Sequence, residues 1–196
     1  YAAWYADVCR STWVAATGPR PDGSEFRAEV IFSSHQQQAA LSVAEKLGAE
    51  LFFFNTYPMT PTRAFRHPYS TFFVGRDSPE TPLLNALSYW AYDNGTHLCI
   101  ATVLAEFRES LGLSRSLLGF KTVFQQLIVG MRLPCFCIWS PSLLPKPTDW
   151  HEHIVVCGSV DRTGGLPSLP ANLLEFIRAG EPPVFFGFGP GSMSRK

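Results

Sequence analysis

Residues 28–54, AEVIFSSHQQQAALSVAEKLGAELFFF, predict a strand, a helix and a second strand in close succession. The apolar runs at 28–32 and 50–54 have the length of short buried strands. Between them, the apolar residues at 40, 43, 44 and 47 follow helical spacing, and Gly48 provides the C-terminal stop. This order is typical of a right-handed βαβ unit. We therefore expect an α/β fold with a parallel sheet that is covered on both faces.

Further elements are predicted along the rest of the chain. Helical spacing continues from Leu83 to about Leu113, where Gly95 is a candidate break, and two shorter helices and three strands follow. The shorter helices are expected at 120–129 and 170–179, and the strands at 135–139, 154–157 and 183–189.

Residues 58–82 are predicted to form a long, irregular but ordered loop. Five prolines exclude regular structure there, yet the segment is also rich in aromatic residues, which disordered loops rarely are. A loop of this length within a compact domain is usually functional. We therefore expect it to line a binding site.

Composition limits the classes of function. Sixteen Lys+Arg balance sixteen Asp+Glu, so the chain has no net charge and no basic stripe for nucleic acid. The five cysteines are odd in number and scattered, which favours reduced thiols in a cytoplasmic protein. No stretch predicts a membrane span, because the longest weakly charged one contains residues that are costly in hydrocarbon.

The glycine-rich turn GFGPGS at 187–192 is the sharpest local signal. Glycines at the carboxyl end of a parallel strand let backbone N–H groups approach a phosphate, and a serine adds a hydroxyl donor. The turn matches neither the dinucleotide fingerprint nor the Walker loop. An ordinary tight turn between a strand and a helix is the alternative interpretation.

Other chemistry-bearing residues give weaker signals. Cys135-x-Cys137 followed by His151-x-His153 suggests zinc, but one-residue gaps strain tetrahedral geometry, so no metal site is predicted. There is no nucleophile elbow. The pair Asp149-Trp150 stands isolated in the sequence, and no carboxylate pair can be assigned acid and base roles from spacing.

Three stretches, taken together, resemble the sterol 3-β-glucosyltransferase-like branch of the UDP-sugar glycosyltransferases. VAEKLG at 43–48, continuing to YPMTPTRAFRHP at 57–68, resembles the family segment AEALGIP…MPWTPTxxFPHP. WSPSLLPKPTDW at 139–150 is similar to SPxLxPKPxDW, and LLEFIRAGEPPVFFGFG at 173–189 to LxxFLxAGxxPVYxGFGS. The three occur in the family's order. Met59 replaces the usual Trp, and Pro190-Gly191 intervene before Ser192.

The resemblance implies a GT-B fold with two Rossmann-like halves that hold the acceptor and the UDP-sugar. Residues 1–140 would be the later part of the acceptor domain, 141–182 a connector with a short strand and a helix, and 183–196 the start of the donor domain. The chain would thus be an internal piece of a longer protein. The family's catalytic base would lie outside it, so we expect no catalytic residue within the chain and no transfer by the chain alone.

The resemblance also assigns site residues and partners. Tyr57, Met59, Thr60 and Phe65 would line the pocket for a sterol or another lipid-like acceptor. Gly189 and Ser192 would contact the donor diphosphate. The reaction would move a hexosyl group, glucose by analogy, from the UDP-sugar co-substrate to the acceptor hydroxyl, with no cofactor and no metal. Peripheral membrane contact remains an open alternative to a purely cytoplasmic location.

Two other interpretations stay open. In the first interpretation, the chain is a non-catalytic sterol- or lipid-binding α/β module derived from such an enzyme. In the second it is an unrelated α/β protein, such as a hydrolase, which would have neither a nucleotide-binding turn nor an apolar acceptor pocket.

Overall fold

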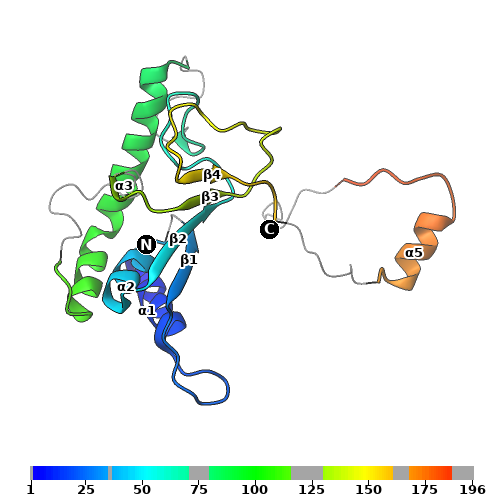
Figure 1. The fold of residues 1–196 in the computed structure, drawn as a ribbon. Coiled ribbons are helices and arrows are strands. Elements are labelled where there is room, and N and C mark those ends of the chain that lie inside the picture. Colours follow the sequence, from blue (N-terminus) through cyan, green and yellow to red (C-terminus); the bar gives the residue numbers. More distant parts are fainter. Residues whose placement is uncertain (1, 35–36, 71–79, 116–129, 161–167, 187–196) are drawn as a thin grey trace. The chain divides into compact units, whose positions relative to one another are not determined.

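The computed structural model describes residues 2–34, 37–70, 80–115, 130–160 and 168–186 (Figure 1). These residues form two compact units, Tyr1–Val160 and Asp161–Lys196. The first contains the helices α1 (Ala2–Thr17), α2 (Ala39–Leu47) and α3 (Pro82–Ser110) and the strands β1 (Val30–Ser34), β2 (Glu50–Asn55), β3 (Cys135–Cys137) and β4 (Ile154–Val156). The second contains α5 (Ala171–Arg178).

The four strands form one parallel sheet in the order β1-β2-β3-β4. Ile31 pairs with Leu51, Phe53 with Cys135, and Cys135 in turn with Ile154. The α/β class, the parallel sheet and the strand–helix–strand unit predicted from residues 28–54 are therefore confirmed. Since β4 pairs with β3, the strand expected in the connector belongs to this sheet. The domain boundaries inferred from the resemblance stay a prediction.

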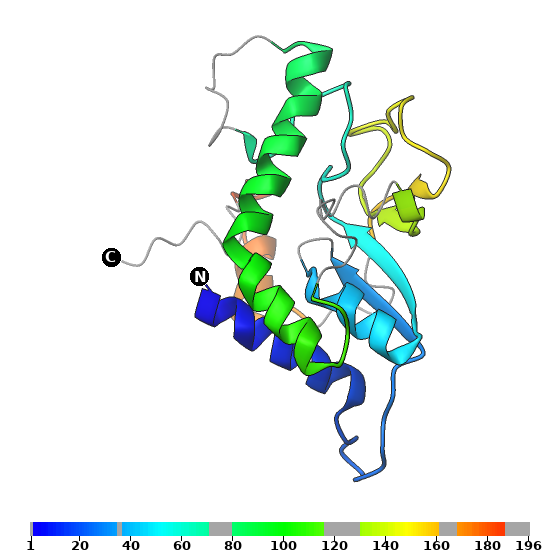
Figure 2. The same cartoon turned by 90° about the vertical axis from the view of Figure 1, so that its left-hand side faces the viewer.

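The helices α1, α2 and α3 lie on one face of the sheet (Figures 1 and 2). On that face, Leu51, Phe53 and Cys135 pack with α2 residues and with Trp139 and Trp150 in the main core cluster. Helix α1 joins α2 and α3 through a second cluster of Tyr5, Cys9, Ala39 and Ile100. Helix α2 ends where Gly48 takes a left-handed conformation (φ 67°), as glycine C-caps do.

The opposite face of the sheet differs from the expectation of two covered faces. There Phe32, Phe52 and Phe136 form a row of stacked rings, with centroids 5.2 and 6.2 Å apart, and Phe32 is 65% exposed. The strands β1, β2 and β3 follow one another in one direction across the sheet. Right-handed connections between them therefore bring the described connecting helices, α2 and α3, to the same face.

Helix α3 is continuous, whereas a break near Gly95 was a candidate from the sequence. Thr81 caps it by accepting a hydrogen bond from Leu84 N–H at 3.3 Å, and Pro82 occupies the first turn, where a missing N–H costs nothing. Beside Gly95, the Asn94 side chain donates to the Trp90 carbonyl at 2.7 Å. This bond keeps a turn-forming side chain satisfied inside the helix.

A buried arginine fastens the end of α3 to α2. The Arg108 guanidinium donates two hydrogen bonds to the Glu45 carboxylate, at 2.8 and 3.3 Å, and Arg108 Nε donates to the Ser114 carbonyl at 2.7 Å. A fourth hydrogen bond reaches Ser42 Oγ at 3.3 Å. The charge is thus both paired and hydrogen-bonded, as a buried charge requires.

In the second unit, α5 confirms the helix expected at 170–179, and none of its residues is buried. The strand expected at 183–189 is absent from its described part, residues 183–186. Its remainder, like the helix expected at 120–129, lies outside the described residues.

Candidate functional site

The candidate site is the loop 56–70, which leaves the sheet at the carboxyl end of β2. Asn55, the last residue of β2, is 3% exposed, and its side chain donates a hydrogen bond to Cys135 Sγ at 3.2 Å. In open parallel α/β sheets, ligands bind outside the carboxyl ends of the strands. The loop predicted from its prolines and aromatic residues to line a site therefore begins where this fold places ligands.

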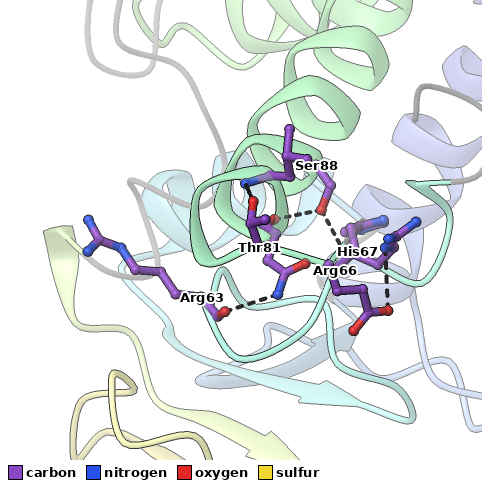
Figure 3. A network of polar contacts seen from close by, with 8 residues as sticks. Arg63, Arg66, His67, Thr81 and Ser88 are labelled. Carbon is purple, nitrogen blue, oxygen red and sulfur yellow. Dashed lines mark hydrogen bonds and ion pairs between the residues drawn. The ribbon is translucent and has the colours of Figure 1, made fainter. Parts of the chain in front are cut away.

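One side of the loop is fastened to the start of α3 (Figure 3). The Asn85 side chain donates to the Arg63 carbonyl at 3.0 Å. The His67 N–H donates to Ser88 Oγ at 2.8 Å, and that hydroxyl donates to the Asn85 carbonyl at 2.6 Å. Arg66 pairs with Glu80 at 3.5 Å. The path of the loop backbone is thus fixed by side chains that the first turns of α3 position.

The other side of the loop is fastened to Asp149 and Trp150. Asp149 accepts from Thr62 Oγ1 and from the Arg63 N–H, both at 2.7 Å, and Trp150 Nε1 donates to the Pro61 carbonyl at 3.0 Å. Sequence reasoning missed this role, because Asp149-Trp150 was assigned no partner. One signal in the sequence could have indicated this contact: the two segments that these bonds connect, 57–68 and 139–150, both resemble the same family.

The four predicted acceptor residues lie in this loop with unequal exposure. Tyr57 and Phe65 are half-buried, and the Phe65 ring meets Trp150 edge-on at 6.3 Å between centroids. Met59 and Thr60 are 3% and 2% exposed and contribute to the interior. The structure therefore brings the four into one loop, and Tyr57 and Phe65 are the two with surface to offer a ligand. Their role in acceptor binding stays a prediction.

Aromatic rings gather around the buried His67. Its ring stacks on Tyr92 with centroids 4.0 Å apart and meets Tyr89 edge-on at 5.1 Å, while Tyr57 meets Tyr69 edge-on at 5.6 Å. His67 Nδ1 accepts a hydrogen bond from the Tyr69 N–H at 3.1 Å. Aromatic pairs in these geometries add stability beyond their buried area, so the wall of the site is a packed surface.

The phenols near the loop remain neutral at ordinary pH. Burial raises the pKa of Tyr57, and a hydrogen bond with Tyr69 raises it further. Burial also raises the pKa of Tyr89, to which the negative charge of Asp149 adds. The half-buried Tyr57 ring therefore carries a neutral hydroxyl, whereas Tyr89 belongs to the interior.

The cysteines and histidines that raised the question of zinc serve other contacts. Cys135 and Cys137 are buried on the helix-covered face of the sheet, and His151 stacks on His153 with centroids 5.8 Å apart. A hydrogen bond from the Cys137 thiol lowers the pKa of Cys135, and the same bond together with burial raises the pKa of Cys137. Within the described ranges, no three side chains of His, Cys, Asp or Glu gather as metal ligands.

The predicted donor residues Gly189 and Ser192 lie outside the described residues. Beside the loop, Asp149 accepts two hydrogen bonds from loop residues, and within the loop His67 Nδ1 accepts one. These bonds hold both side chains in fixed orientations. In the described part of the chain, no helix combines the length and the apolar character of a membrane span.

The α/β class and the four-stranded parallel sheet are consistent with a Rossmann-like half of a GT-B fold. Comparisons with known proteins agree with that class. The chain is 31% identical over 186 residues to sterol 3-beta-glucosyltransferase UGT80A2 of Arabidopsis thaliana, a match that covers 93% of this chain and 28% of the relative. No protein-family model matches the chain.

Two further relatives carry the same name. Sterol 3-beta-glucosyltransferase UGT80B1 of Arabidopsis thaliana is 31% identical over 85% of this chain and 26% of its own length. The sterol 3-beta-glucosyltransferase of Leptosphaeria maculans is 27% identical over 96% of this chain and 12% of its own. The resemblance found in three stretches is thus confirmed: the chain is similar, over nearly its whole length, to a segment of sterol 3-beta-glucosyltransferases. It spans about a quarter of the length of the two Arabidopsis relatives.

Proposed function

We propose that this chain forms the acceptor-binding wall of a UDP-sugar-dependent glycosyltransferase that moves a hexosyl group, glucose by its relatives' names, to the hydroxyl of a sterol or similar lipid. The observation that carries the proposal is the similarity to UGT80A2 over 93% of the chain. The fastened aromatic loop at the carboxyl edge of the sheet supports it. Binding a sterol there would bury apolar area, at about 25 cal/mol per Å².

In such a reaction the acceptor hydroxyl attacks the anomeric carbon of the sugar as UDP leaves, and a general base takes the hydroxyl proton. We propose that this chain contributes the orientation of the acceptor, with Tyr57 and Phe65 facing it, while the base lies elsewhere in the enzyme. Orientation by itself supplies much of a rate enhancement. Gly189 and Ser192 remain the proposed contacts to the donor diphosphate.

The second candidate function is a non-catalytic sterol-binding module. The same anchored loop supports it, because binding an apolar ligand there would require no donor site. The two candidate functions differ in whether the intact protein binds a nucleotide-sugar donor. A donor site would favour the enzyme.

Titration of the chain with dehydroergosterol tests the proposal, with energy transfer from tryptophan as the signal. We expect saturable binding that 5α-cholestanol displaces and that a hydrocarbon lacking the hydroxyl, 5α-cholestane, displaces less well. In parallel, radiolabelled UDP-glucose with cholesterol should give no transfer by the chain alone. A lack of saturable sterol binding contradicts the binding role, and steady turnover contradicts the placement of the base elsewhere.

A further inference from the structure

Asp149 and Trp150 reach across the fold to three consecutive residues of the candidate loop. They are separated from Pro61, Thr62 and Arg63 by 86 to 89 positions in sequence, yet three hydrogen bonds of 2.7 to 3.0 Å connect the two segments. Thr62 Oγ1 also accepts the Ala64 N–H at 3.0 Å while donating to Asp149. The Asp149 carboxylate, the Thr62 hydroxyl and the Ala64 N–H thus form a short chain of hydrogen bonds that ends on the loop backbone.

Two of the three bonds end on backbone atoms, Arg63 N–H and the Pro61 carbonyl. Bonds to backbone atoms fix the path of the loop whatever side chains it carries. The bonds that Asp149 accepts involve an ionised carboxylate, and such bonds are about twice as strong as those between neutral groups. This makes Asp149 the stronger of the two anchors.

Ring contacts transmit the same constraint to a residue that we propose faces the acceptor. The Trp150 indole is 6% exposed and lies between Trp139, at 6.2 Å, and Phe65, at 6.3 Å between ring centroids. The Phe65 ring therefore takes its place from Trp150. Since Asn85 holds the Arg63 carbonyl and Ser88 holds the His67 N–H from the α3 side, the loop is fastened on both sides of Phe65.

We propose that Asp149 and Trp150 are positioning residues that hold the loop 56–70 in one conformation and so determine which acceptor ring shapes the site accepts. This inference rests on the proposed function, because it names what sets selectivity in that same site. Neither residue is assigned contact with the acceptor. Their effect runs through Pro61, Thr62 and Arg63 to the ring of Phe65.

The experiment compares two sterols that differ only in the configuration at C5, the flat 5α-cholestanol and 5β-cholestanol, which is bent at the junction of rings A and B. Their dissociation constants are measured by displacement of dehydroergosterol from the whole 196-residue chain. Three variants each remove one of the bonds. Asp149→Asn keeps an acceptor for the Thr62 hydroxyl but removes the acceptor for the Arg63 N–H, and Trp150→Phe keeps an aromatic ring but loses the bond to the Pro61 carbonyl. Thr62→Val removes the hydroxyl that donates to Asp149. Glu152→Gln removes a nearby exposed carboxylate, and Trp90→Phe changes an exposed indole on α3, so both serve as matched controls.

We expect the wild type to prefer the flat sterol and each of the three variants to lower that preference about five- to tenfold, as loss of a hydrogen bond to a charged group or of a buried bond allows. The controls should keep the wild-type ratio. Hydrogen exchange at Arg63 and Ala64 should accelerate in Asp149→Asn and Thr62→Val, with unfolding midpoints close to that of the wild type.

A merely structural role would weaken the binding of both sterols equally and leave their ratio unchanged, and that result overturns the inference while leaving the proposed function intact. If Asp149→Asn does not fold, Thr62→Val decides, since it leaves Asp149 in place. A wild-type chain that binds neither sterol contradicts the proposed function and this inference together. The two failures are therefore distinguishable.

Discussion

Cys9 shows how a single side chain can report on the packing of α1. It is 1% exposed in the cluster that joins α1 to α2 and α3, and burial raises the pKa of its thiol to about 11. In an unfolded chain the thiol ionises near pH 9.0. Burial therefore favours the neutral thiol, which packs as a small apolar group.

The raised pKa predicts a loss of stability at alkaline pH. Below about pH 9, the Cys9 thiol is protonated in both the folded and the unfolded chain, and its contribution to the free energy of unfolding is fully present. Between about pH 9 and 11 the unfolded chain releases its proton first, so the free energy of unfolding falls. From about pH 8 to 10.5 we expect the wild type to lose about 2 kcal/mol more than Cys9→Ala.

Urea unfolding at the two pH values measures that difference, and Cys99→Ala, which changes an exposed thiol, is the matched control. The control should follow the wild type. Equal losses in the wild type and Cys9→Ala would show that the thiol is not buried as described.

At the same scale, the family resemblance predicted an acceptor role for Tyr57 and Phe65, which stays a prediction, but it assigned no role to the anchors of the loop. Prolines and aromatic residues are a local signal, so the loop could be predicted from its own composition. The bonds from Asp149 and Trp150 join segments that are distant in sequence, and no spacing rule reports such a pair. The burial of Met59 and Thr60 was not predicted either, because residue type alone does not distinguish a loop side chain that faces the interior from one that faces outward.

Among the elements, the strand–helix–strand unit was predictable because its periodicity changes sharply at Ser33 and again at Gly48. Helix α1 was not predicted from the sequence. Its buried residues Tyr5, Cys9 and Ala16 keep helical spacing, but exposed Trp4 and Val14 blur the apolar face. Helix α3 was expected, with Gly95 as a candidate break, and its continuity shows that the packing of a long helix outweighs the cost of one glycine, about 1 kcal/mol.

The bidentate bond between Arg108 and Glu45 predicts how strongly α2 and α3 depend on one another. Glu45→Ala leaves the guanidinium, 2% exposed, with only Ser42 Oγ and the Ser114 carbonyl among its described partners. We expect a loss of about 2–3 kcal/mol in the free energy of unfolding, less than for a wholly buried pair because Glu45 is 48% exposed. Urea unfolding measures it.

Glu106→Ala is the matched control, because it removes an exposed carboxylate from α3, the helix that carries Arg108. It should change the free energy of unfolding by less than about 0.5 kcal/mol. A similar small change in Glu45→Ala would mean that the buried guanidinium does not need its carboxylate.

For the whole molecule, the first unit presents two apolar surfaces of different character. The loop 56–70 is fastened by polar bonds on two sides and offers half-buried rings. The face with Phe32, Phe52 and Phe136 is a flat row of rings with Val155 41% exposed beside it. A parallel sheet normally has both faces covered, so this second surface is the natural competitor for any apolar probe.

Photo-crosslinking with a diazirine-bearing sterol separates these two surfaces and tests the acceptor-wall proposal most directly. The whole chain is irradiated with the probe, with and without excess 5α-cholestanol, and the labelled residues are mapped by mass spectrometry. The proposal predicts label on residues 56–70 that the unlabelled sterol displaces, and label on the sheet face that it does not displace. Displaceable label confined to Phe32, Phe52 or Phe136, or no displaceable label anywhere, would contradict it.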